Sequence, residues 1–241
     1  MKTTKLFVTA KRPAMIMMVC MLAVFFSSCL KNNDNDYAAA PARALVSVVN
    51  ASPGSQALDF YLDQNKANNQ AMIYGDGIDY IQAYTGKRTA TFYLSGTQQK
   101  IKSDTLTLQQ NQFYTLYLTN MPAQAEYFLV RDSINRPAAG KATIRLVNVS
   151  PNAPAVDLAI KNGAVLATNK SYKSASAFIP VNGNSTYTFE IRQAGTNNVL
   201  VTLTDVKIKG DAIYTVWLQG LNNGSEQTKL NANIQNNVLY Y

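Results

Sequence analysis

The sequence lacks histidine altogether and carries little charge. Among its 241 residues there is no histidine, and only 15% are charged. Without histidine, Ser-His-Asp and Cys-His catalysis, His-liganded zinc sites and the usual proton shuttle near neutral pH are excluded. No Walker loop, GxSxG elbow or HExxH motif occurs either. Because 47% of the residues are hydrophobic, the chain is not disordered and can bury a core. The composition therefore argues against most enzymes.

An excess of positive charge is also missing once the N-terminus is considered separately. The formal net charge is +8, but four of the 22 basic residues precede an apolar run and all 14 acidic residues follow it. Without that start, the net charge is about +4, which is ordinary for a soluble surface. The remaining sequence has no basic cluster, so no nucleic-acid partner is expected.

The apolar run is too short to cross a membrane. Residues 14–26 would form a helix of roughly 20 Å, against a hydrocarbon core of ~30 Å. A basic start, a short apolar stretch and then the small residues Ser27 and Ser28 are typical of a signal peptide. With Cys29 next, the segment resembles a bacterial lipobox, which implies cleavage after residue 28 and lipidation of Cys29. The alternative is a secreted protein with an ordinary signal peptide.

The residues after Cys29 are typical of a tether. Residues 29–43 are polar or alanine-rich and show no hydrophobic period. Since Cys20 would leave with the signal peptide, the mature chain has one cysteine and no internal disulfide. We expect a protein held at the cell envelope by palmitate-type acyl chains on Cys29. The outer membrane is the expected location, and the choice between a periplasmic and a surface-facing orientation stays open.

The strongest organisational signal is an internal repeat. Four short blocks recur in the same order, each about 97 to 100 residues later. The pairs are residues 46–53 with 144–151, residues 58–62 with 156–160, residues 91–94 with 188–191, and residues 114–118 with 214–218. Such a constant offset indicates a duplicated unit of a little under 100 residues.

Each block alternates between apolar and other residues with period two, which predicts β-strands separated by turns. The pattern favours an all-β fold with two tandem immunoglobulin-like antiparallel β-sandwich domains. We expect the first at residues 44–136 and the second at residues 141–235. A linker lies at residues 135–140 and a tail at residues 236–241.

The two copies of the first block carry a family resemblance. Val48, Asn50 and Ser52-Pro53, followed by the strand at residues 58–62, resemble the opening of an extracytoplasmic β-sandwich family catalogued as domain of unknown function 4397. The resemblance covers roughly residues 44–235. It implies a β-sandwich outside the cytoplasm, and it brings no established activity. Asn50 and Asn148 stand where many members have histidine, which weakens any ligand site built on that position.

Several polar residues have a simpler structural interpretation than a functional one. Asn and Ser ahead of Pro usually form side-chain-to-backbone bonds in turns. The residues concerned are Asn50, Ser52, Pro53, Asn148, Ser150 and Pro151. Asp59 and Asp157, which recur at matched positions, are expected to be solvated or to bind a loop amide. Residues 75–79 offer two carboxylates but lack the other ligands of a calcium loop. We expect no metal, no cofactor and no catalytic residue.

One aromatic pattern suggests a binding face. The alternation that turns Phe60, Phe92 and Leu116 inward turns Tyr61, Tyr93 and Tyr117 outward. Exposed aromatic groups often mark contacts with sugars or proteins. The alternatives are that the tyrosines pack between the two copies or that the strands lie in different sheets.

These observations favour a membrane-anchored, non-catalytic binding or adhesion module of the cell envelope, whose partner is an envelope protein or glycan. Two alternatives remain. The chain could be a structural spacer, or it could be an accessory subunit or enzyme that acts on envelope polymers through carboxylates.

Overall fold

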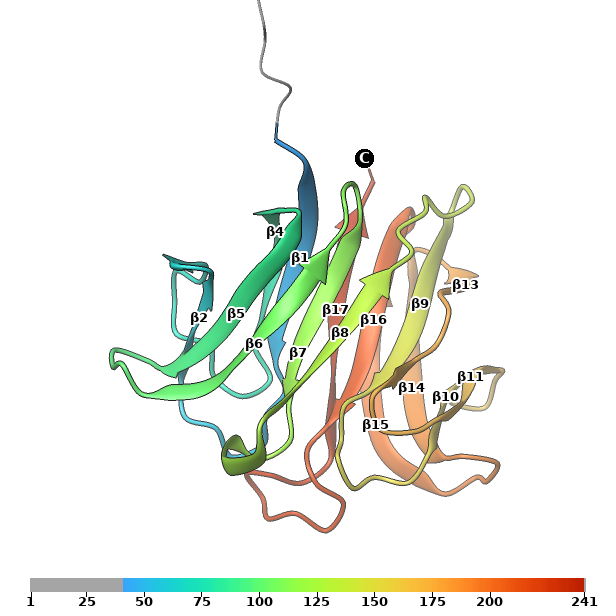
Figure 1. Ribbon diagram of the computed structural model, residues 1–241. Helices are drawn as coiled ribbons and strands as arrows, with labels where there is room; N and C mark the ends of the chain where they lie inside the picture. Colours follow the sequence, from blue (N-terminus) through green and yellow to red (C-terminus); the bar gives the residue numbers. More distant parts are fainter. Residues whose placement is uncertain (1–40, 241) are drawn as a thin grey trace, which may run out of the picture. The chain divides into compact units, whose positions relative to one another are not determined.

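A computed structural model describes residues 41–240. Cys29, the predicted signal peptide and most of the predicted tether lie outside the described residues. The described part consists almost entirely of strands, arranged as two β-sandwiches that follow one another in the sequence (Figure 1). Among residues 41–240, no helix is long and apolar enough to cross a membrane.

Sandwich 1 is built from the first eight strands. They are β1 (Arg43–Asn50), β2 (Leu58–Leu62), β3 (Asn65–Lys66), β4 (Gly77–Tyr84), β5 (Gly86–Leu94), β6 (Lys100–Leu108), β7 (Phe113–Thr119) and β8 (Glu126–Asp132). A short 3-10 helix, η2 (Pro122–Gln124), precedes β8. Inner sheet 1 has the order β4-β1-β7-β8, and outer sheet 1 has the order β3-β2-β5-β6.

Sandwich 2 repeats this arrangement with nine strands. They are β9 (Lys141–Asn148), β10 (Val156–Ile160), β11 (Val165–Lys170), β12 (Ser174–Ala175), β13 (Ile179–Asn182), β14 (Ser185–Gln193), β15 (Val199–Ile208), β16 (Ala212–Gln219) and β17 (Asn231–Leu239). Inner sheet 2 has the order β12-β9-β16-β17, with β13 also paired to β9. Outer sheet 2 has the order β11-β10-β14-β15. β12 and β13 together take the place of β4.

The alternating sequence explains the two cores. In β2 and β5, Phe60 and Phe92 are fully buried and lie 4.9 Å apart between their ring centroids. Phe189 occupies the same place in sandwich 2. Each core contains the inward residues of one inner and one outer sheet. Each sandwich therefore has an apolar core of its own.

A third apolar cluster joins the two sandwiches. It contains Val49, Ala51, Tyr117 and Val130 of sandwich 1 and Val147, Val149 and Trp217 of sandwich 2, all buried. These residues lie on the faces of the two inner sheets that point away from their own cores. The inner sheets therefore pack against each other, and we call this contact the junction. In Figure 1 the green strands β7 and β8 stand beside the red strands β16 and β17.

The predicted all-β sandwich fold is confirmed. Pairing is antiparallel except between β1 and β7 and between β9 and β16, which are parallel in each sandwich. The last strand, β17, runs to Leu239, so residues 236–239 of the predicted tail belong to a strand.

Candidate binding sites

The polar side chains of the two Asn-x-Ser-Pro turns form hydrogen bonds with the backbone and fix its conformation. Asn50 Oδ1 accepts a hydrogen bond from the Ser52 backbone N–H at 3.2 Å, and Asn148 Oδ1 accepts the corresponding bond from Ser150 at 3.0 Å. Both asparagine side chains are fully buried and also donate to a backbone carbonyl, that of Met72 or Lys170. Buried amides bonded on both sides fix the turn.

The serines of these turns tie them to a distant strand end. Ser52 Oγ donates to the carbonyl of Asn120 at 2.6 Å, and Ser150 Oγ donates to the carbonyl of Gly220 at 2.6 Å. Both serines are fully buried. The repeated motif therefore has a structural role in this fold, and its polar atoms are engaged within the protein.

The recurring aspartates bind loop amides. Asp59 Oδ2 accepts from the Gly96 backbone N–H at 3.1 Å, and Asp157 Oδ2 accepts from Gly195 at 2.9 Å. Burial raises the pKa of Asp59, but hydrogen bonds from Lys66, Gly96 and Asn68 outweigh this effect and hold the pKa below its usual value. Asp59 therefore stays ionised and anchors the turn between β5 and β6.

The loop at residues 75–79 contacts the other sandwich. Asp76 accepts from the backbone of Ile73, and Asp79 accepts from Gln235 of β17 at 3.4 Å. Within residues 41–240, no cluster of three acidic, cysteine or histidine side chains could hold a metal ion.

The three candidate tyrosines do not form one face, and this expectation of the sequence is corrected. Tyr117 lies on inner sheet 1 and is fully buried in the junction, with its ring centroid 6.4 Å from that of Trp217. Tyr61 and Tyr93 lie on outer sheet 1. Period two tells which side of a strand a residue faces, but it does not tell to which sheet the strand belongs or what covers it.

Tyr61 and Tyr93 do lie together on an open surface. Their rings meet edge to face, with centroids 5.3 Å apart and an angle of 84° between the planes. Both are partly exposed on the outward face of β2 and β5. Around them lie the hydroxyls of Thr91 and Ser103, 2.7 Å apart, and the exposed side chain of Lys66. We call this surface the tyrosine platform.

Sandwich 2 carries a different surface at the matching place. Ala159 and Glu190 replace the two tyrosines, and Ala159 is fully buried. Glu190 pairs with Arg192 of the same strand, with 2.5 Å between Oε2 and Nη2. The tyrosine platform therefore belongs to sandwich 1 alone.

A buried ion pair crosses the junction. Arg145 of β9 and Asp132 of β8 are both almost fully buried, and Nη2 lies 2.7 Å from Oδ1. Asp132 Oδ2 also accepts from the hydroxyls of Tyr80 and Thr115, each at 2.6 Å. Burial and the neighbouring Asp132 carboxylate raise the pKa of Tyr80, so its hydroxyl remains a donor. The carboxylate is thus neutralised from several sides, as a buried charge requires.

The network continues into sandwich 2. Arg145 Nε donates to Thr215 Oγ1 at 2.9 Å, and Thr215 in turn donates to Asn237 Oδ1 at 2.6 Å. Asn237 donates to Tyr80 Oη at 3.3 Å, which closes the network across the junction. Thr115 with Asp132 and Thr215 with Asn237 occupy equivalent places in the two inner sheets. Of the two equivalent partners, Asp132 therefore carries a negative charge and Asn237 is neutral.

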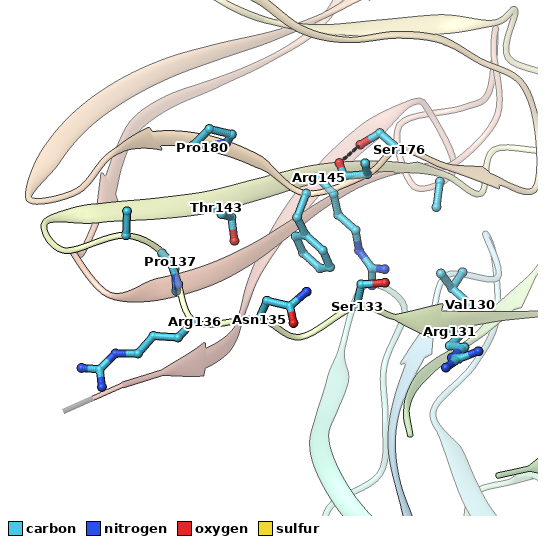
Figure 2. A pocket seen from close by; sticks show the side chains of 14 residues that line it. Val130, Arg131, Ser133, Asn135, Arg136, Pro137, Thr143, Arg145, Ser176 and Pro180 are labelled. Atoms are coloured by element: carbon cyan, nitrogen blue, oxygen red, sulfur yellow. Dashed lines mark hydrogen bonds between the residues drawn. The ribbon is translucent and has the colours of Figure 1, made fainter. Parts of the chain in front are cut away.

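A cleft opens beside this ion pair, between the end of β8, the linker and the strands β9, β12 and β13 (Figure 2). Its volume is about 590 Å³. The residues that line it include three arginines, several small polar residues and several apolar residues. They are Val130, Arg131, Ser133, Asn135, Arg136, Pro137, Ala138, Thr143, Arg145, Ala175, Ser176, Ala177, Phe178 and Pro180. Cavities of this size hold small ligands in many proteins.

A comparison with known families finds a match in the first part of the chain. Residues 44–159 match the domain of unknown function DUF4397. The match supports the family resemblance found in the sequence. It covers sandwich 1 together with β9 and most of β10, the first two strands of sandwich 2. No curated protein matches the chain.

Beyond the DUF4397 match, the chain shows distant similarity to solved structures. A family 26 carbohydrate-binding module from Eubacterium rectale, solved with maltoheptaose, is 10% identical, with a TM-score of 0.27 over 80% of this chain and 96% of that module. A streptococcal virulence factor described by its α-glucan binding is 12% identical, with a TM-score of 0.26 over 76% of this chain and 94% of that one. Scores this low carry no inference about what this chain binds.

Sequence reasoning raised packing between the two copies only as an alternative for the tyrosines, and it did not find the buried ion pair or the cleft. Arg145 lies at the position of Ser47 in the repeat, and Phe178 lies at that of Tyr80, so both replacements can be read from the sequence. A charged residue among the apolar residues of a central strand was the signal that could have marked a buried ion pair. The partner, Asp132, could not be found without knowing which faces meet.

Proposed function

We propose that this protein is a lipid-anchored module of the cell envelope that binds an envelope glycan or protein without catalysis. The observation that carries this proposal is the tyrosine platform. Two partly exposed tyrosine rings lie 5.3 Å apart on an otherwise polar sheet face. Aromatic rings with hydroxyl groups at their rims suit stacking on sugars and contacts with protein side chains.

Three buried carboxylates among the described residues favour a non-catalytic function. Asp59 and Asp157 hold loop amides, and Asp132 neutralises Arg145 inside the junction. A carboxylate that works as a general acid or base must reach substrate. These three are instead committed to partners inside the protein, which favours a binding module over an enzyme acting on envelope polymers.

We also infer that sandwich 2 is a second, diverged copy of DUF4397. Its strand order matches that of sandwich 1. Both copies keep the Asn-x-Ser-Pro turn with the same hydrogen bonds. The loss of the tyrosine platform in sandwich 2 suggests that one copy binds the partner while the other supports it.

Replacing both platform tyrosines tests the binding function. The protein without its first 29 residues would be applied to an array of cell-envelope polysaccharides, and the ligands found would be titrated by calorimetry. The change of Tyr61→Ser together with Tyr93→Ser is expected to weaken binding about tenfold or more, because it removes the ring contacts.

The matched control is Tyr84→Ser, which removes an exposed tyrosine of the same sandwich stacked on Arg43. This variant should bind as the wild type does, and all variants should melt at similar temperatures. Equal binding by the platform variant would contradict the proposal. A protein that retains neither glycans nor envelope proteins would instead support the spacer alternative.

The anchor is tested at Cys29. Burial of two acyl chains at ~0.8 kcal/mol per methylene makes membrane attachment effectively permanent. Cys29→Ser is therefore expected to abolish incorporation of labelled palmitate and to release the protein from the membrane fraction. The alternative of a secreted protein predicts that the wild type is soluble without detergent and takes up no label.

A further inference from the structure

The preceding chain enters sandwich 1 at one end of the molecule, where several turns meet. The Thr85 N–H donates to the Ala42 carbonyl at 3.2 Å, just before β1. The Asn111 N–H donates to the Arg43 carbonyl at 2.9 Å. These bonds place the β4–β5 turn and the β6–β7 turn beside the start of β1. Strand β8 ends here as well, since its last residue pairs with the first residue of β7.

Sandwich 2 contributes its own turns to the same end. The Asp211 N–H donates to the Lys141 carbonyl at 2.8 Å, and the Tyr240 N–H donates to the Asp211 carbonyl at 2.9 Å. The Gly183 N–H donates to the Gly140 carbonyl of the linker at 3.0 Å. In Figure 1 the blue start of β1 and the red end of β17 lie at this end, which we call the tether end. It comprises residues 41–43, 84–87, 108–113, 131–141, 182–185, 207–212 and 239–240.

The tether end carries the whole net charge of the described residues. It has seven basic and two acidic residues, whereas the remainder of residues 41–240 has ten of each. One of its two acidic residues, Asp132, is already paired with Arg145 inside the junction. All seven basic residues are exposed. They are Arg43, Lys87, Arg131, Arg136, Lys141, Lys207 and Lys209.

These seven charges are largely uncompensated. Within residues 41–240 only Arg136 of the seven forms an ion pair, with Asp211 at 3.9 Å, and such an exposed pair is weak. Lys141 donates to the side-chain amide of Asn182, and Arg131 donates to that of Gln112, and both acceptors are neutral. Figure 2 shows the side chain of Arg136 extending away from the cleft. The tether end is therefore open to an anionic partner.

Two tyrosine rings lie among these cations. The Cζ atom of Arg43 lies 4.9 Å from the centroid of the Tyr84 ring, and that of Arg136 lies 5.4 Å from the centroid of the Tyr240 ring. Tyr84 is 50% exposed, and Tyr240 is partly exposed. Tyrosine is enriched where proteins meet the interface between membrane and water, because its ring is apolar and its tip is polar. The tether end combines such rings with basic side chains, which suits a surface of anionic lipid.

We propose that the tether end lies on the anionic phosphate headgroups of the membrane that holds the lipid on Cys29. The contact rests on the proposed anchor for its location. Whatever its conformation, the segment between Cys29 and residue 41 can span no more than about 40 Å. A surface held this close needs little affinity of its own, because its effective concentration at the membrane is high. Each basic side chain near an anionic surface strengthens binding about fivefold.

This contact holds the tyrosine platform clear of the membrane. Strand β5 starts at the tether end with Gly86, and Tyr93 lies seven residues further along it. At ~3.3 Å per residue, Tyr93 is roughly 23 Å from the tether end. The headgroup layer is less than about 10 Å thick, so the platform stays accessible to its partner.

Binding to vesicles tests the contact without the anchor. The chain that begins at residue 30 keeps both cores and the junction, and it would be sedimented with two kinds of vesicle. One is phosphatidylcholine alone, and the other contains about 30% phosphatidylglycerol. We expect binding only to the anionic vesicles, weakened at least tenfold when the salt is raised from about 0.05 M to about 0.5 M. At equal ionic strength, inorganic phosphate should displace the protein no better than chloride, because the partner is a lipid surface.

A triple variant locates the contact at the tether end. Replacing Lys87, Lys141 and Lys209 together by Gln removes three of its charges, from both sandwiches. Binding to the anionic vesicles is expected to weaken about thirtyfold or more. The melting temperature should stay near that of the wild type, because none of the three lysines forms an ion pair within residues 41–240.

The matched control removes the same amount of charge from the opposite end. Lys100, Lys170 and Lys229 lie at or just before the strand ends farthest from the tether end. Replacing these three by Gln gives the same net charge as the first variant and should weaken vesicle binding less than about threefold. Equal losses in the two triple variants would show that net charge alone is responsible and would overturn the proposal.

Two other results would also overturn it. One is equal binding to vesicles with and without anionic lipid. The other is binding that appears only after Asp34 and Asp36 are replaced by Asn, which would show that these acidic residues occupy the tether end. Palmitate labelling at Cys29 judges the anchor separately. The variant with Tyr61 and Tyr93 replaced should bind vesicles as the wild type does, so failure of the platform and failure of this contact are distinguishable.

Discussion

At the residue scale, the junction depends on two positions at which the copies differ. Sandwich 2 has Arg145 where sandwich 1 has Ser47, and sandwich 1 has Asp132 where sandwich 2 has Asn237. Each change alone would bury an uncompensated charge, whereas the two together form an ion pair across the junction. Charge complementarity of this kind selects one pairing of surfaces over others.

Removing one member of this pair should be strongly destabilising. Asp132→Asn leaves the Arg145 guanidinium buried without its counter-ion, and we expect the free energy of unfolding to fall by about 3 kcal/mol or more. Replacing Arg145 by Met in the same chain should recover most of this loss, because no unpaired charge remains. Urea unfolding of the two variants and the wild type measures both effects.

The control for this experiment is a carboxylate at the surface. Asp104 lies 3.7 Å from Lys102 and is mostly exposed, so Asp104→Asn should change the stability by less than about 0.5 kcal/mol. If Asp132→Asn has an equally small effect, the ion pair does not hold the junction.

At the element scale, the sequence predicted where the strands lie more accurately than it predicted what packs against their faces. Period-two alternation located β2, β5 and β7, and the constant offset of the repeat predicted their counterparts β10, β14 and β16. It also placed Tyr61 and Tyr93 on one side of their strands. Tyr117 was predicted on the outward side of β7, and the sequence left open whether that side is exposed or packs between the two copies. Inner sheet 2 covers it and Tyr117 is buried. Alternation is a local property, whereas covering a sheet face depends on contacts between residues about 100 positions apart.

The loop before β4 should be sensitive to any side chain at Gly75. This glycine has a φ of 91°, and an added Cβ would lie 2.9 Å from Asn233 Nδ2 and 3.1 Å from Gln219 Nε2 of sandwich 2. Its carbonyl also accepts a bond from Asn233 at 3.0 Å. Gly75→Ala is therefore expected to cost more than the roughly 1 kcal/mol of backbone strain alone, because the Asn233 side chain of β17 and the Gln219 side chain of β16 must also shift.

Gly96→Ala is the matched comparison. Gly96 also has a positive φ, 72°, but an added Cβ would meet nothing within 4 Å. Its cost should be limited to the backbone, about 1 kcal/mol. Thermal or urea unfolding of both variants separates strain from contact. Equal losses of stability in the two variants would indicate that a Cβ at position 75 does not displace the side chains of sandwich 2.

At the scale of the whole molecule, the two sandwiches share a buried face and are expected to unfold together. The repeat predicted two units, each with its own core, and both cores are present. It did not predict the third cluster, in which Tyr117 and Trp217 lie between the units. The residues of this cluster alternate correctly within their strands, and only the packing of one sheet on another distinguishes them from surface residues.

The two sandwiches, expressed as separate fragments, should associate with each other and should not self-associate. Residues 44–136 and residues 141–241 each contain a complete core, so each is expected to show β-type circular dichroism. Each also exposes its half of the junction, and self-association would bury Asp132 against Ser47 or Arg145 against Asn237 without an opposite charge. Mixing the two fragments should therefore give a one-to-one complex on size exclusion, with the fluorescence of Trp217 shifted to shorter wavelength as it is buried. In that mixture, Asp132→Asn should weaken the complex. Fragments that remain apart, or that pair with themselves equally well, would show that the junction forms only because the linker holds the two sandwiches together.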